Sequence, residues 1–304
     1  MDLASMINQL ISLFLMMFIG YAVARAGIMT PEFRARLSSF NLNTAAPCII
    51  LSSVLQSSSS ASAMIGAVGV AVLYFLLMIV FAALITRLVR TPKAHRGWDR
   101  LMLIFTNVGF MGIPVVQSIY GPGGVAMLSM FILMFNIFFF SYGVVLISSG
   151  AEFNLKALAN ACIFAALAGF LFGMTGWHLP RPIEDTLATV GAMNTPLAMM
   201  IIGASLAHSD VKAALTNKRL YRVGFLSMLV MPMLVFLALR FLPIDPMLIG
   251  VATVCAAMPI GGNCAMIADI YAPGDLTASH AVILTTLMSG LTLPLVCAVM
   301  TALL

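Results

Sequence analysis

Long stretches of this chain carry no charged side chain, and short polar segments separate them. Leu101–Ala151 runs for 51 residues and Leu37–Thr86 for 50 residues without a charge. Because about 20 apolar residues span a bilayer as a helix, each stretch predicts two helices, split at "YGPGG" and at "QSSSSAS" respectively. One helix each is predicted for the other charge-free runs, which are Leu3–Ala24, Ala157–Pro180, Thr186–Ser209, Val223–Leu239, Pro246–Ala268 and Leu276–Leu304. The pattern therefore predicts an all-α integral membrane protein with ten transmembrane helices.

Composition agrees with this pattern and narrows the function. The chain is 62% hydrophobic and 8% charged, too few charges to cover a soluble protein, so lipid is the solvent and a net charge of +5 is no sign of nucleic-acid binding. Five Cys and four His are scattered without metal-ligand spacing, so we expect no metal and no cofactor. The predicted helices also lack the clustered acids, bases and nucleophiles that an enzyme needs. A membrane enzyme or a receptor remains a rival interpretation.

The basic residues predict the orientation. With the N-terminus outside, all but two of the 15 Lys and Arg residues fall in inner loops, and only Arg181 and Arg240 fall outside. Such asymmetry is typical of cytoplasmic loops. We therefore expect a multi-pass protein of a bacterial inner membrane with both termini on the periplasmic side. The segment Leu3–Ala24 follows Asp2 and is long enough to span, which favours a helix over a cleaved signal peptide.

The chain also repeats itself weakly. A shift of 151 residues places "GPGG" on "APGD", and a shift of 149 aligns Gly20 with Gly169, Pro31 with Pro180 and Pro47 with Pro196. Residues 1–151 and 152–304 then form two repeats of five helices, and the odd number makes the second repeat inverted. Such a repeat is typical of secondary transporters. Chance matching of Gly and Pro in apolar sequence is the alternative.

The fourth and ninth predicted helices contain residues that break helices. Pro inside a helix removes a backbone hydrogen bond and costs about 3 kcal/mol, and every freed backbone group in lipid needs another partner. The breaks occupy matching places in the two repeats. They consist of Asn107, Gly109, Gly112, Ile113 and Pro114 in "TNVGFMGIP", and of Pro259, Gly261, Gly262 and Asn263 in "MPIGGN".

These breaks predict a site for an anion. Under the shift of 151, Pro259 falls beside Asn107 and Asn263 falls near Pro114, so crossed helices would let each Asn side chain satisfy backbone freed in the other. Purely structural capping by each Asn is the alternative. Helices that begin near the two Pro residues would direct N-terminal ends, each with roughly +0.5 charge, at mid-membrane. Because no Lys or Arg lies deep in a predicted helix, we expect a small carboxylate to be held by dipoles and amides.

Further polar residues flank the breaks. Asn43, Pro47 and Ser52 in the second helix match Asn194 and Pro196 in the seventh, and they are candidates for the facing wall of the site. Kinked scaffold helices whose polar groups satisfy their own backbone are the alternative. Asp269 is the one acid near a predicted helix interior, so it is a candidate proton site. An interfacial position for Asp269 is the other interpretation.

The chain resembles the auxin efflux carrier family, including its bacterial malate or malonate permeases. The resemblance is carried by "NLNTAAPCII", "NVGFMGIP", "PLAMMIIGASLA", "MPIGGNCAMIADIY" and "TLMSGLTLP", and it extends over nearly the whole chain. It implies two inverted five-helix repeats, with helices four and nine broken and crossed in a transport part beside a scaffold part. It also implies carboxylate substrates at the crossing, elevator-type alternation and a homodimer, and it places Asn107, Pro114, Pro259 and Asn263 in the crossover motif.

Two features bear on specificity and coupling. The middle link around Glu152–Lys156 is short, whereas plant members of the family have a long loop there, so plant-hormone specificity is in doubt. A sodium-coupled symporter or a sodium/proton antiporter of similar fold is the alternative function. An antiporter needs acids at the crossing and only Asp269 is available, whereas sodium could bind carbonyl and Asn oxygens without an acid. Either H⁺ or Na⁺ therefore remains a candidate partner.

Overall fold

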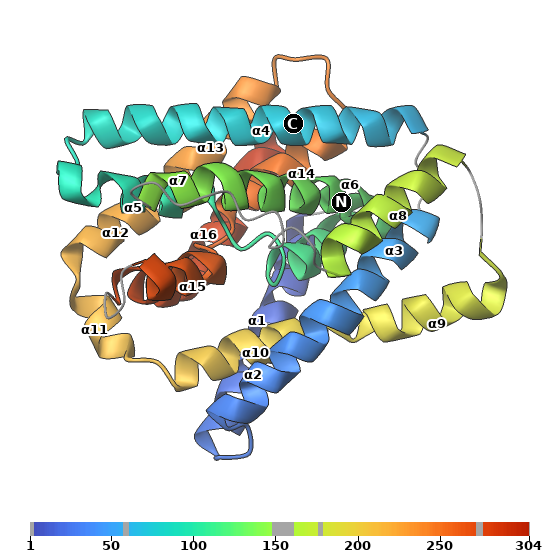
Figure 1. The fold of residues 1–304 in the computed structure, drawn as a ribbon, viewed down its shortest axis with the longest axis horizontal. Helices are drawn as coiled ribbons and strands as arrows, with labels where there is room; N and C mark the ends of the chain where they lie inside the picture. Colours follow the sequence, from blue (N-terminus) through green and yellow to red (C-terminus); the bar gives the residue numbers. More distant parts are fainter. Residues whose placement is uncertain (1–2, 57–60, 148–160, 176–178, 272–275, 304) are drawn as a thin grey trace. The chain divides into compact units, whose positions relative to one another are not determined.

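The computed structural model describes residues 3–56, 61–147, 161–175, 179–271 and 276–303 (Figure 1). Throughout these ranges the chain forms helices joined by short turns, and its one extended pairing is an antiparallel bridge between Thr106 and Ile260. The predicted all-α class is confirmed. The chain divides into two compact units, each assembled from both halves of the sequence. Unit 1 comprises Met1–Gly69, Gly109–Leu133 and Ala159–Ser209, and unit 2 comprises Val70–Val108, Met134–Leu158 and Asp210–Leu304.

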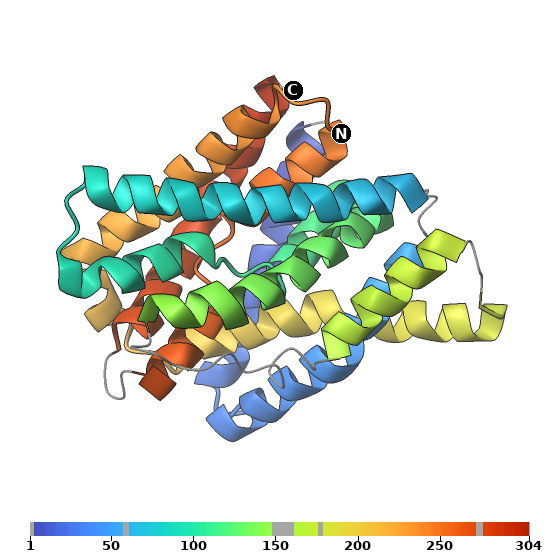
Figure 2. The same ribbon diagram turned by 45° about the horizontal axis from the view of Figure 1, so that its top comes forward.

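Unit 1 contains the helices that open each of the two repeats predicted from the sequence, together with a segment from the middle of the first repeat. α3 packs against both α8 and α9, and α1 packs along α10 (Figure 2). The elements are α1 (Leu3–Arg25), α2 (Pro31–Phe40), the π-helical turn η1 (Asn41–Ala45), α3 (Ala46–Gln56), the start of α4 (Ala61–Leu88), most of α6 (Gly112–Phe138), α8 (Ala161–Thr175), α9 (Arg181–Ala192) and α10 (Asn194–Ala207).

Two glycines let α1 and α10 touch backbone to backbone. A Cβ atom on Gly20 would meet the Met200 backbone, and one on Gly203 would meet the Met17 carbonyl, both closer than van der Waals contact allows. Small residues at such crossings permit the close approach that stabilises helix pairs in lipid. Each glycine is therefore required by the packing of unit 1.

Unit 2 contains the first part of the break in the predicted fourth helix, up to Val108, and the whole break in the predicted ninth helix. Within it, α16 packs against α12, η4, α14 and α15. The elements are the rest of α4, α5 (Lys93–Ile104), the end of α6, the π-helical turn η2 (Phe139–Gly143), α7 (Val144–Ile147), α11 (Val211–Thr216), α12 (Lys218–Phe225), the π-helical turn η4 (Leu226–Val230), α13 (Met231–Leu239), α14 (Pro246–Ala257), α15 (Gly262–Tyr271) and α16 (Thr277–Leu303).

Aromatic side chains fill the core of unit 2 behind the first break. The Phe105 ring packs edge-on against Phe135 and Phe139, at centroid distances of 5.6 and 5.1 Å, and stacks on Phe75 at 6.3 Å. Phe105 is fully buried. Edge-to-face and offset pairs of this kind add about 0.5–1.5 kcal/mol each beyond the burial of their surface. The cluster thus anchors the residue at which the first break begins.

Helix length and polarity agree with a multi-pass membrane protein. Five described helices are long and apolar enough to cross a bilayer, namely Ser62–Leu88, Gly112–Ile147, Arg181–Ala207, Lys218–Leu239 and Thr277–Met300, and shorter apolar helices cover Leu10–Arg25, Ala161–Thr175 and Pro246–Ala257. α6 is interrupted at Gly121 (φ 66°, ψ −159°), inside the "YGPGG" segment where the sequence predicts a boundary between two helices. The count of ten spans and the inverted repeat stay predictions.

Candidate functional site

The first break separates α5 from α6. α5 ends at Ile104, the chain is irregular from Phe105 to Met111, and α6 begins at Gly112. The second break separates α14 from α15, because Met258 is extended (φ −60°, ψ 150°) and Pro259 cannot donate a backbone hydrogen bond. Both breaks lie where the sequence predicts them. Phe105 to Val108 and the whole second break belong to unit 2.

The two breaks hold each other through their backbones. The Asn107 N–H donates to the Pro259 carbonyl at 2.8 Å, and the Gly261 N–H donates to the Phe105 carbonyl at 3.1 Å. Between these bonds Thr106 and Ile260 pair in antiparallel fashion. Gly261 fits because a Cβ there would lie 3.0 Å from the Thr106 carbonyl oxygen. Backbone groups that each break leaves without a partner in its own helix are therefore hydrogen-bonded to the other break.

Two threonine hydroxyls complete this crossing, and sequence reasoning missed both. Thr106 Oγ1 donates to the Cys255 carbonyl at 2.7 Å, and Thr285 Oγ1 of α16 accepts from the Ile260 N–H at 3.1 Å. Both threonines are fully buried or nearly so. Thr106 sits beside Asn107 in the motif, which was a signal that sequence reasoning could have used. Nothing local marks Thr285, because its role depends on the packing of α16.

The side chains of Asn107 and Asn263 are left free by this arrangement. Both residues are half-buried, and neither carboxamide has a hydrogen-bond partner among the residues that the structure describes. Backbone pairing and the threonine hydroxyls perform the capping that the sequence analysis assigned to the two Asn side chains. Two half-buried amides without protein partners are suited to a polar ligand, because a buried polar group that stays unpaired costs about 1–3 kcal/mol.

The two helices that follow the breaks differ at their first turns. α15 begins with Gly262, which is exposed, and Asn263, which is half-buried, and its Cys264 N–H donates to the Gly261 carbonyl at 3.0 Å. At α6 the Ile113 and Val115 N–H groups already donate to Gly109 and Met111, at 3.4 and 3.1 Å. Gly112, Ile113 and Pro114 are also buried. The positive end of α15 is thus the more open of the two to an anion.

Most of the other predicted site residues lie in unit 1 with partners of their own. Asn194 accepts a hydrogen bond from Asn41 at 3.1 Å, and this pair lies where η1 meets the start of α10. Asn43 donates to the Ser39 carbonyl at 2.8 Å, and Ser52 donates to the Ile49 carbonyl at 3.3 Å.

The two flanking prolines of unit 1 stand at helix starts. Pro47 is the second residue of α3 and Pro196 is the third residue of α10. Pro47 directly follows the π-helical turn η1 without a break in the helix, since the Ala46 N–H donates to the Asn41 carbonyl.

The crossing carries no charge of its own. Leu101–Ala151 and Pro246–Ala268 contain no Asp, Glu, Lys or Arg. Among the described residues no group of three or more His, Cys, Asp and Glu side chains is arranged to hold a metal ion. The side chain of Asp269 lies outside the part that the structure describes. The polar groups that these two segments could offer to a ligand are therefore amides, hydroxyls and helix ends.

Comparison with known proteins places the chain in a family. A family described as "Membrane transport protein" matches residues 5–156 and 148–297, nearly the whole chain. The chain belongs to this membrane transport family. The resemblance to auxin efflux carriers that the sequence motifs indicated is confirmed.

Two relatives align with this membrane transport protein over almost their full lengths. One, from Methanothermobacter thermautotrophicus, is described as an uncharacterized transporter and is 23% identical over 302 residues, which cover 95% of this chain and 96% of the relative. The other, from Rhizobium meliloti, is described as a putative malonate transporter and is 20% identical over 306 residues, covering 94% and 93%. The family and both relatives are transporters rather than enzymes.

Replacing Thr285 with Val should loosen the crossing of this transporter. Valine keeps the shape but removes the oxygen that accepts from Ile260, so a buried N–H loses its partner at a cost of about 1–3 kcal/mol. We expect a lower melting temperature for purified Thr285→Val. Thr286→Val is the matched control, because the Thr286 hydroxyl donates only to its own helix at Val282. Equal melting temperatures for the two variants would contradict this role for Thr285.

Proposed function

We propose that this transporter carries small organic anions, carboxylates such as malate, malonate or auxin-like acids. One observation supports the proposal above the others. The free carboxamides of Asn107 and Asn263 stand on a crossing whose backbone is otherwise satisfied, next to the open first turn of α15. Amide N–H groups and a helix N-terminus donate to a carboxylate without a full positive charge.

A transporter must release its substrate as well as bind it. A site without charged residues is consistent with this requirement. A buried Arg or Lys would hold a carboxylate through strong charge-assisted bonds, whereas neutral donors bind it more weakly and allow release. In this proposal Asn107 and Asn263 orient the carboxylate, and Pro259 keeps the second break open. Asn43, Ser52 and Asn194 remain proposed contacts of the facing wall, and Gly112, Ile113 and Pro114 shape the start of α6.

The proposed transport cycle is an elevator-type alternation. Unit 2 contains the crossing inside a compact body with an aromatic core, so it can carry the bound anion as one piece. Unit 1 would supply the scaffold, with a homodimer as the working form in a bacterial inner membrane. The proposed orientation has both termini in the periplasm. Asp269 is the proposed proton site if transport is proton-coupled.

Uptake into proteoliposomes tests this function. The purified protein would be reconstituted and offered radiolabelled malonate, malate and a monocarboxylate, with protein-free liposomes and a labelled neutral sugar as controls. Sodium and the pH gradient would be varied separately. Saturable uptake of a carboxylate is the expected result, and the gradient that drives it identifies the coupling ion, including the alternative of sodium symport. Binding or uptake of none of these acids would contradict the proposal.

A further inference from the structure

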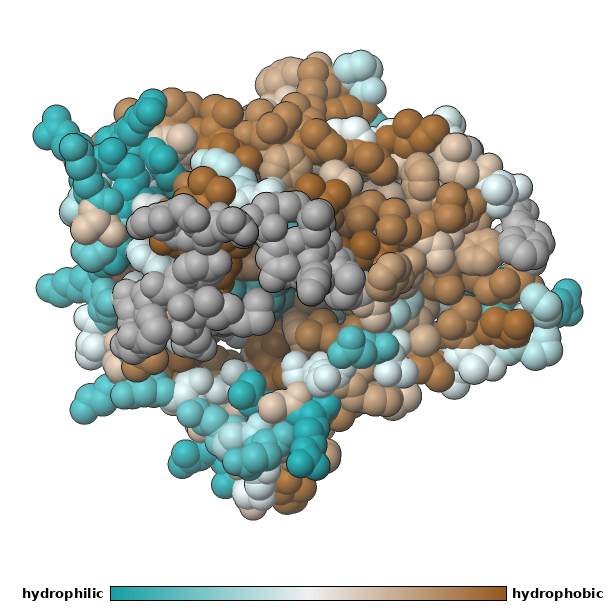
Figure 3. All heavy atoms as spheres, viewed as in Figure 1, coloured by the Kyte–Doolittle hydropathy of each residue, from teal (hydrophilic) through white to brown (hydrophobic). Residues whose placement is uncertain are grey.

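Exposed basic side chains gather at one end of unit 2. We define this basic end by five residues that are exposed and make no ion pair among the residues that the structure describes. They come from the end of α4, the turn that follows it, the start of α5 and the first and last turns of α12. They are Arg87, Arg90, Lys93, Lys218 and Arg222. Figure 3 shows hydrophilic side chains collected at the corresponding edge, beside an otherwise largely hydrophobic face.

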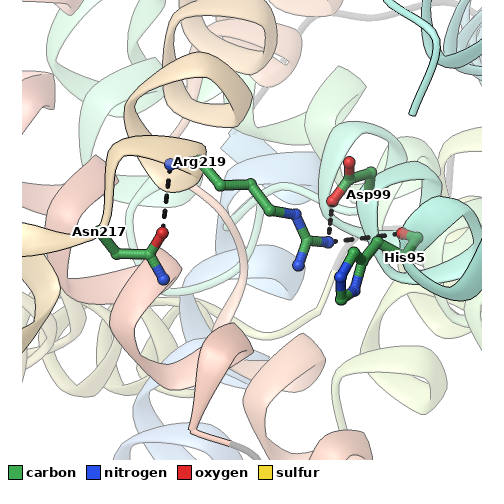
Figure 4. Close-up of polar contacts among 4 residues, drawn as sticks. All are labelled: His95, Asp99, Asn217 and Arg219. Carbon is green, nitrogen blue, oxygen red and sulfur yellow. Dashed lines mark hydrogen bonds and ion pairs between the residues drawn. The ribbon is translucent and has the colours of Figure 1, made fainter. Parts of the chain in front are cut away.

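Within the described ranges, two acids on elements of this part of unit 2 already have partners. Asp99 of α5 is buried and forms an ion pair with Arg219 of α12, which also donates to the His95 carbonyl at 3.5 Å (Figure 4). Asp210 accepts from the Ala213 N–H at 2.9 Å and caps α11. Arg219 is therefore neutralised inside the unit, while the five residues of the basic end have no acidic partner in the described part of the chain.

The basic end lies where two apolar helices of membrane-spanning length terminate. The apolar span Ser62–Leu88 ends at this cluster, and the apolar span Lys218–Leu239 begins there. Two aromatic residues of the interfacial type stand beside the charges, Trp98 half-buried and Tyr221 42% exposed. Trp and Tyr concentrate at the membrane–water interface, where an apolar ring and a polar edge are both accommodated. The charges thus meet the layer of lipid headgroups.

We propose that the basic end binds the phosphate groups of anionic phospholipids. Clustered Lys and Arg at the ends of membrane helices attract anionic lipid with about 1 kcal/mol per residue. Long side chains with flexible stems can reach headgroup phosphates while their apolar stems stay against the helices. This inference does not depend on which substrate the transporter carries.

Lipid binding by the full-length protein tests the proposal. Protein in neutral phosphatidylcholine nanodiscs would be titrated with phosphatidylglycerol, and bound lipid would be counted by native mass spectrometry. The double variant Arg87→Gln/Lys93→Gln should weaken phosphatidylglycerol binding about 25-fold, at about fivefold for each lost charge. The matched control Arg181→Gln/Arg240→Gln removes two exposed Arg residues that are not part of the basic end and should bind like the unchanged protein.

Three results would overturn the proposal. They are equal affinity for phosphatidylglycerol and phosphatidylcholine, equal weakening in the control variant, and full displacement of the lipid by inorganic phosphate at constant ionic strength. The last would indicate a site for free phosphate rather than for a headgroup. Melting temperatures of both variants in phosphatidylcholine alone, unchanged from the starting protein, show that the comparison concerns lipid and not folding.

Discussion

Alanine at Asn107 or at Asn263 is expected to lower carboxylate uptake about 10- to 100-fold without unfolding the protein. A hydrogen bond to a charged group contributes about 1.5–3 kcal/mol, and 1.4 kcal/mol is a tenfold change in binding. Each side chain is half-buried and has no partner among the described residues, so its removal costs the protein little. A loss of uptake without a loss of stability is the signature of a substrate contact.

The same pair of measurements distinguishes a structural role. If the Asn instead caps a helix, its replacement by Ala would lower the free energy of unfolding by about 1 kcal/mol. The melting temperature would then fall as well. Asn8→Ala is the control, because Asn8 is exposed in α1, far along the chain from both breaks. Uptake of malonate and malate should be measured for all three variants, together with thermal melting in detergent. Normal uptake by both Asn107→Ala and Asn263→Ala would contradict the proposal that the substrate binds at the crossing.

Replacing Arg219 with Gln should destabilise unit 2 by about 3–5 kcal/mol. The Asp99 side chain is only 4% exposed, and its ion-pair partner is Arg219, 120 residues further along the chain. Removing one partner leaves the other charge buried without compensation, which is strongly unfavourable. Because α5 continues directly into the first break, a loosened α5 should also lower the uptake of substrate.

A double variant makes this prediction specific. Asp99→Asn/Arg219→Gln removes both charges and keeps groups that can hydrogen-bond, so it should be clearly more stable than Arg219→Gln alone. Asp99→Asn by itself should be milder than Arg219→Gln, since the Arg219 side chain is 22% exposed and can turn toward water. Thermal melting of the four proteins in one detergent measures the coupling. Additive losses in the double variant would show that the pair contributes no interaction of its own.

Much of the crossing could be predicted from the sequence. Pro and paired Gly disrupt helices for steric reasons that do not depend on their surroundings, so the breaks at Met258–Gly261 and before Gly112 were visible in advance. The kink at Gly121 was marked by "YGPGG" in the same way. The helix boundaries were less visible, because π-helical turns such as η1 and η4 carry no charge or proline pattern of their own.

Hydrogen-bond partners that lie far apart along the chain could not be predicted from the sequence. The sequence predicts that the Asn side chains pair with the broken backbone, because polar groups must be satisfied in lipid. That requirement was correct, but the partners are backbone groups of the opposite break and the hydroxyl of Thr285. A hydrogen-bond partner far along the chain depends on the angle and depth of helix packing, and no local propensity encodes these.

The sequence by itself determined that this is an integral membrane protein and that it belongs to the transport family. It also determined where two of the helices break. Hydrophobic runs, motifs and backbone sterics are properties of neighbouring residues, so they can be read along the chain. Tertiary structure alone decided that the two breaks bond to each other, that the Asn107 and Asn263 side chains have no partner among the described residues, and that Asp99 neutralises Arg219. These outcomes follow from which backbone and side-chain atoms packing brings within hydrogen-bond distance.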